Sequence, residues 1–81
     1  MPELEVYNYR IIRVINAYEK HMECLPDVDA LIRLMQIPRA KLLYRLRQMG
    51  ANDLVESQRS FRHGTMKTVY MSNVTDATYQ E

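Results

Sequence analysis

The chain has few cysteines, which stabilise small secreted domains as disulfides, and few glycines, which form phosphate-binding loops. Its one cysteine, Cys24, cannot make an internal disulfide, which fits a reducing cytoplasm. Gly50 and Gly64 are its only glycines, so it has no glycine-rich loop to cradle a phosphate. No apolar run approaches the roughly 20 residues that a membrane-spanning helix needs. The sequence therefore predicts a cytoplasmic chain that makes no membrane contact.

Metal ligands and catalytic groups are scarce as well. His21 and Cys24 are spaced to offer two ligands, but a structural zinc site needs four, and the rest of the chain adds only His63. Two histidines also give no convincing Ser–His–Asp or Cys–His arrangement for nucleophilic catalysis. We therefore expect no metal, no cofactor and no enzymatic activity.

Apolar side chains at helical spacing are the main feature that the chain does have. Its 81 residues are 47% hydrophobic and 26% charged, which predicts one globular domain with a small core. Residues 4–22 carry apolar side chains at steps of three and four, which predicts a helix with one apolar stripe. The stripe consists of Leu4, Tyr7, Ile11, Val14, Ile15, Tyr18 and Met22.

Two shorter helices are predicted after a break at Pro26. Asp27 or Asp29 suits the cap of the first of them, because a carboxylate there accepts hydrogen bonds from free backbone N–H groups. A turn at 35–38 leads into the second, over 38–49, with Gly50 as the expected end. The expected inner positions of the two helices are Leu31, Leu34, Met35, Leu42, Leu46 and Met49.

A β-hairpin is predicted to follow these helices. Leu54 and Val55 begin a strand that runs to about Arg59, and residues 60–64 form a turn with His63 and Gly64 at its tip. Residues 65–72 are rich enough in β-branched and aromatic side chains to form the return strand. The predicted fold is mainly α with a small hairpin: a winged helix-turn-helix domain over 1–72, with a two- or three-stranded wing, and a loose tail over 73–81.

Charge is unevenly distributed along the chain, although the formal net charge is only +1. Residues 1–37 hold four basic and six acidic side chains, a net of −2. Residues 38–67 hold seven basic and two acidic side chains, a net of +5. A domain polarised in this way can direct one face toward phosphate groups, although a solvated helix face beside a basic hairpin would give the same totals.

The stretch from Leu31 to Glu56 resembles the MarR/ArsR-type winged-helix regulators of prokaryotes. Three positions depart from that pattern: Gln36 stands where Gly or Asn is common, Asp53 where Gly is usual, and Ile32 where Ala is usual. The apolar positions that match are Leu31, Met35, Ile37, Leu42, Leu46, Met49, Leu54 and Val55.

The resemblance implies a sequence-specific double-stranded DNA-binding protein, a small transcriptional regulator. Its third helix would enter the major groove, and its hairpin would contact the flanking backbone. The expected contact residues of the helix are Arg39, Ala40, Lys41, Leu43, Tyr44, Arg45, Arg47 and Gln48. Those of the hairpin are Arg59, Arg62, His63 and Lys67.

We also expect a homodimer, because small regulators gain specificity by pairing two half-sites. Tyr9 and Ile12 fall outside the main stripe of the first helix, and they would form the interface together with Tyr79 of the tail. Two alternatives stay open. One is a winged-helix module that docks on a protein partner or belongs to a larger assembly, and the other is a plasmid or phage replication or maintenance protein that binds DNA.

Overall fold

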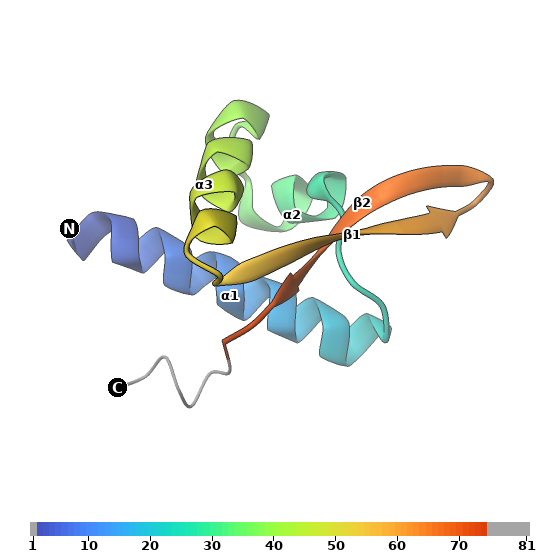
Figure 1. The fold of residues 1–81 in the computed structure, drawn as a ribbon, viewed down its shortest axis with the longest axis horizontal. Coiled ribbons are helices and arrows are strands. Elements are labelled where there is room, and N and C mark those ends of the chain that lie inside the picture. The colour runs from blue at the N-terminus through green and yellow to red at the C-terminus, as the bar shows by residue number, and fades with distance from the viewer. Residues whose placement is uncertain (1, 75–81) are drawn as a thin grey trace.

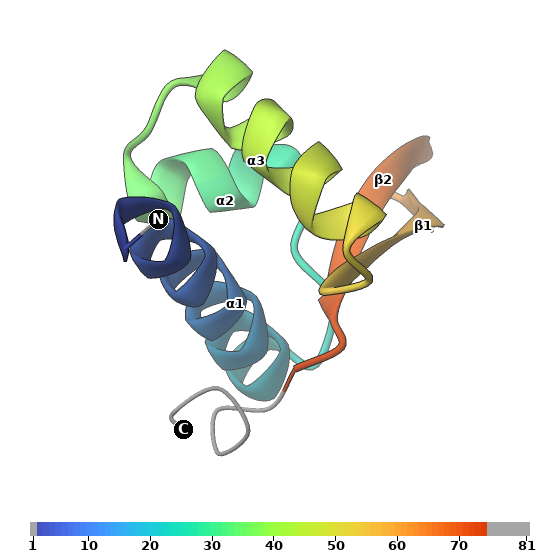
Figure 2. The same cartoon turned by 60° about the vertical axis from the view of Figure 1, so that its left-hand side comes forward.

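The computed structural model describes the backbone of residues 2–74 and the side chains of residues 6–74. These residues form three helices and one antiparallel hairpin, and the hairpin follows beside the end of the third helix (Figures 1 and 2). The elements are α1 (Pro2–Met22), α2 (Val28–Met35), α3 (Arg39–Ala51), β1 (Val55–Arg62) and β2 (Thr65–Ser72). The prediction of a mainly α fold with a small hairpin is confirmed, and the arrangement is consistent with a winged helix.

Asp27, one of the two caps that the sequence offered, caps α2, which begins at Val28. Its backbone is extended, and its Oδ1 accepts a hydrogen bond of 2.8 Å from the backbone N–H of Ala30. The same residue forms an isolated antiparallel bridge with Val69 of β2. The backbone N–H of Tyr70 donates a hydrogen bond of 2.9 Å to the carbonyl of Pro26, the residue before Asp27. The segment between α1 and α2 therefore caps a helix and also pairs with the hairpin.

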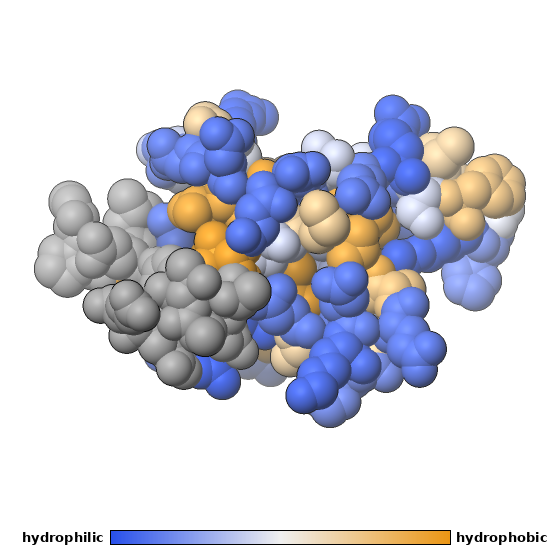
Figure 3. All heavy atoms as spheres, turned by 60° about the horizontal axis from the view of Figure 1, so that its bottom comes forward, coloured by the Kyte–Doolittle hydropathy of each residue, from blue (hydrophilic) through white to orange (hydrophobic). Residues whose placement is uncertain are grey.

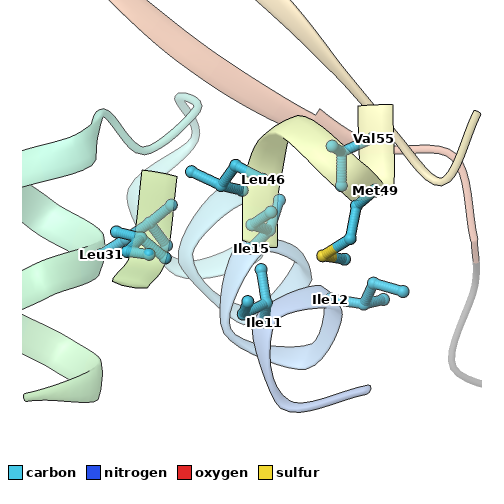
Figure 4. Packing of buried hydrophobic residues seen from close by; sticks show 8 residues of the cluster. Ile11, Ile12, Ile15, Leu31, Leu46, Met49 and Val55 are labelled. Carbon is cyan, nitrogen blue, oxygen red and sulfur yellow. The ribbon is translucent and has the colours of Figure 1, made fainter. Parts of the chain in front are cut away.

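The core lies between α1, α2, α3 and the beginning of β1 (Figure 4). The expected core residues of α3, Leu42, Leu46 and Met49, are all buried. Ile12 is fully buried too, so the expectation that it lies on spare apolar surface is wrong. Met49 at the end of α3 and Val55 at the beginning of β1 belong to the same buried cluster as Ile12. The buried side of α1 therefore includes Ile12 as well as Ile11 and Ile15.

Two other apolar residues lie further out than their positions predicted. Leu34 is 53% exposed and Met22 is 58% exposed, although both were expected on inner faces. The core contacts of α2 are instead made by Leu31, which is fully buried, with Ile32 and Met35 packed beside it. At 100° per residue the contacts of Leu31, Ile32 and Met35 define one side of α2, and Leu34 lies beyond the edge of that side.

The two departures from the winged-helix pattern at Gln36 and Asp53 both occur in left-handed backbone. Gln36 has a φ of 57° and ends α2, and Asp53 has a φ of 61° before β1. Gly50 does not end α3, because the helix continues to Ala51 and the left-handed turn falls at Asp53. Glycine adopts this conformation without the steric cost that a side chain carries.

The hairpin is longer and its turn tighter than predicted. β1 continues to Arg62, so Ser60 and Phe61 belong to the strand and only His63 and Gly64 form the loop. Both loop residues have positive φ, at 52° and 77°, as a two-residue turn between twisted strands requires. The extra length carries the end of the hairpin away from the helices (Figure 1).

Replacing Gln36 with glycine should stabilise the protein. The left-handed backbone at position 36 would lose its side-chain strain, and we expect a gain of about 0.5–1 kcal/mol in the free energy of unfolding, measured by urea denaturation. Gln58→Gly is the matched control, because Gln58 lies in β1 with negative φ and should lose stability. A loss of stability in both variants would contradict the strain argument.

Candidate nucleic-acid interface

The outward side of α3 presents a ridge of small, aromatic and basic side chains. Ala40, Tyr44 and Arg47 are exposed, and Gln48 is half-buried beside them. The Gln48 Nε2 donates a hydrogen bond of 2.8 Å to the Tyr44 hydroxyl, which holds the two side chains together. These residues recur at steps of three and four, so they share one side of the helix, opposite the buried Leu42 and Leu46. The helix wheel predicted these four residues on this side, together with Lys41.

Lys41 and Arg45 reach sideways to α1 rather than along the ridge. The Lys41 Nζ and the Arg45 guanidinium carbon each lie 4.7 Å from the centre of the Tyr7 ring. The Arg45 side chain is half-buried, and its Nε and Nη1 have no hydrogen-bond partner among the described residues. A cation over an aromatic face is attracted by the ring quadrupole. Both side chains therefore hold α3 against α1, and Arg45 is a poorer candidate for contact with a base than the sequence suggested.

Arg39 lies at the beginning of α3 and pairs with Asp29 of α2. The distance from its Nη2 to the Asp29 Oδ1 is 2.5 Å, and both side chains stay more than half exposed. Exposed ion pairs contribute little to stability because water screens them. Arg39 can exchange this partner for a phosphate at little cost, so it stays a candidate contact beside the ridge.

The strand register divides the hairpin side chains between two faces. Residues that are directly paired across the strands project to the same side, and successive residues alternate. The face toward α3, called the α3-side face, consists of Ser57, Arg59, Phe61, Met66, Thr68 and Tyr70. The opposite face, called the loop-side face, consists of Gln58, Ser60, Arg62, Thr65, Lys67 and Val69.

The loop-side face is tied to the segment between α1 and α2. The Arg62 Nη2 donates a short hydrogen bond to the carbonyl of Leu25, and the Lys67 Nζ lies 3.6 Å from the Asp27 Oδ2. Val69 is buried on the same face. Arg62 and Lys67 were expected to point toward a ligand. These two side chains instead attach the hairpin to the segment between α1 and α2, so they do not continue the surface of Arg47.

A groove separates the α3-side face from α3 itself. Leu43 and Arg47 line it from the helix, Thr68 and Tyr70 line it from the hairpin, and its volume is about 280 Å³. Leu43 is half-buried here, which favours packing over base contact. Burial raises the pKa of the Tyr70 phenol, so that side chain stays neutral at physiological pH.

Arg59 and His63 are the expected hairpin residues that stay exposed. The structure adds two residues that sequence reasoning missed: Phe61 and Met66 are 68% and 50% exposed and lie directly opposite each other near the hairpin end. Extending the period-two alternation from Ser57 through Arg59 would have placed Phe61 on this face. Figure 3 shows apolar side chains gathered at that end of the molecule.

Other kinds of site were sought in the part of the chain that the structure describes. Over these residues no group of three or more histidine, cysteine, aspartate or glutamate side chains is placed to hold a metal ion. No described helix has the length and apolar character needed to cross a membrane. Comparison of the chain with protein-family models, curated proteins and solved structures finds no match.

The different environments of Arg62 and Arg59 predict different effects on stability. Arg62→Ala should lower the free energy of unfolding by about 1–2 kcal/mol, because the hairpin loses its hydrogen bond to the Leu25 carbonyl. Arg59→Ala, the matched control on the opposite face, should stay within about 0.5 kcal/mol of the wild type. Urea denaturation measures both. Equal losses of unfolding free energy in the two variants would contradict the conclusion that only the loop-side face holds the hairpin in place.

Proposed function

We propose that the chain is a sequence-specific double-stranded DNA-binding protein that acts as a small transcriptional regulator in the cytoplasm. The observation that carries the proposal is the exposed ridge of α3, which includes Arg47, with Arg59 on the facing side of the hairpin. α3 has 13 residues and is therefore about 20 Å long, and a helix of this size fits the major groove.

Each exposed group has a role in this proposal. Arg47 can donate two hydrogen bonds to a guanine edge, and Gln48 can read an adenine edge. Arg39 at the beginning of α3 and Arg59 on the hairpin would contact phosphates, which position the protein without reading sequence. His63 at the hairpin turn would approach the sugar-phosphate backbone beside the neighbouring groove of the duplex.

A protein-docking module is the second candidate, favoured by one specific observation. Tyr44 is 58% exposed at the middle of the ridge, and exposed aromatic side chains are enriched at protein interfaces. The response to salt distinguishes the two functions. DNA binding should fall steeply as salt is added, because each phosphate contact releases a counterion, whereas a protein-docking module should bind random duplex DNA hardly at all.

Selection of bound sequences from a random duplex pool is the direct test. If the ridge reads bases, Arg47→Ala should relax the selected motif at one base pair, at a cost of about 1–3 kcal/mol there. Arg59→Ala should weaken all sequences alike and should reduce the salt slope by about one unit. Glu56→Ala at the beginning of β1 is the control for a change of exposed charge. Absence of any selected motif in the wild type would refute the proposal.

We further propose that the protein binds DNA as a homodimer, through a surface other than the one the sequence suggested. Ile12 is buried within one chain, Tyr9 is half-buried with its hydroxyl accepting a hydrogen bond from Arg13, and Tyr79 lies outside the described residues. The exposed Met22 and Leu34 instead line an apolar hollow of about 500 Å³, whose described lining residues all belong to α1 and α2. Two copies that pair there would leave both α3 ridges free.

Leu34→Asp should convert this dimer to a monomer, because a carboxylate would be buried at the interface without a partner. Light scattering at micromolar concentration would show the mass falling to that of one chain, 9.6 kDa. Val6→Asp, at a half-exposed position near the beginning of α1, is the control and should leave the mass unchanged. A wild-type mass of one chain, with and without DNA, would contradict the dimer.

A further inference from the structure

The end of the hairpin combines two exposed apolar side chains with basic surroundings. Phe61 and Met66 are paired across the strands, one residue pair before the turn, and both are at least half exposed. Their neighbours along the hairpin are hydrogen-bonding or basic, and residues 57–74 contain no aspartate or glutamate. Asp27 and Asp29 line the hollow beside Met66, and each is paired with a basic side chain, Lys67 and Arg39. An apolar group displayed this way on a small protein usually marks a binding surface.

The chemistry of the surroundings indicates what covers these two side chains. Arg59 lies on the same face two residues before Phe61, and His63 follows at the turn. A complementary partner must therefore offer a flat apolar surface bordered by negative charge. Stacked bases between two phosphate backbones have this character, and every base presents a face on which an aromatic ring can stack.

The contacts that hold the hairpin leave Phe61 and Met66 exposed to such a partner. Arg62 and Lys67 hold the loop-side face to the segment between α1 and α2, so the opposite face is left toward α3 and solvent. Met66 lines a shallow hollow together with Arg39 and Leu43 of α3, so the pair faces the same side as the beginning of that helix. One ligand can therefore contact α3 and the hairpin end together.

We propose that Phe61, supported by Met66, inserts as a wedge between base pairs when α3 occupies the neighbouring major groove. This inference rests on the proposed DNA-binding function and adds deformation of the duplex to it. Apolar side chains that enter a base step unstack it and kink the duplex. Pyrimidine–purine steps such as TpA unstack most easily, so the protein should prefer them at the position under the hairpin.

The absence of tryptophan from the chain allows a direct test. Phe61→Trp introduces the only indole, and its fluorescence should be quenched when duplex DNA with central TpA steps is added, because the indole stacks on a base. Val6→Trp, at a position exposed to a similar extent on α1, is the matched control and should show no quenching. Phe61→Ala should bind the TpA duplex about five-fold or more weakly than the wild type, and should lose its preference over a rigid A-tract duplex.

The possible failures are distinguishable. If Phe61→Trp retards DNA in a gel without quenching, the wedge is wrong and the proposed DNA binding stands. If the wild type retards no duplex DNA, both proposals fail. A change of indole emission with phosphatidylserine vesicles but not with DNA would overturn the wedge in favour of an anionic membrane surface.

Discussion

The contact between the Pro26–Asp27 segment and β2 is the constraint on which the rest of the structure depends. The Asp27 carboxylate caps α2 and attracts Lys67, while the backbone beside it accepts a hydrogen bond from Tyr70. One short segment thus sets where α2 begins and where the hairpin lies. Because α3 follows α2 after a turn of only three residues, the direction of the α3 ridge is also set by this segment.

Local signals in the sequence were sufficient to predict much of this fold. The cap at Asp27 was recognisable as a carboxylate just after a helix break, and the spacing of Leu42, Leu46 and Met49 identified the buried side of α3. The end of α3 was predicted wrongly from another local signal, the position of Gly50. Gly50 suits a helix end, but the left-handed residue is Asp53, and no local rule favours aspartate over a nearby glycine for that position.

The candidate site was harder to predict, because its charges have partners that are distant in sequence. Arg45 faces Tyr7 of α1, and Arg62 reaches the carbonyl of Leu25. A helical wheel or an alternating strand pattern gives the side on which a residue lies, but not which other element packs there. The same limit explains Ile12, whose burial depends on the end of α3 and the beginning of β1. Arg47 and Arg59 stayed exposed because no element covers them within the described residues.

The pairing of the hairpin has a consequence for how the protein behaves at high concentration. Among residues 2–74, β2 has a neighbour on each side, β1 and the bridge at Asp27, whereas β1 pairs only with β2 and is an edge strand. Such edges offer unpaired backbone groups to other molecules and promote aggregation. Glu56, Arg59 and Arg62 place a charge at every third position of this edge, and charged side chains on an edge strand oppose the addition of a second strand. The polar sequence of β1 thus protects the free edge that the fold leaves open.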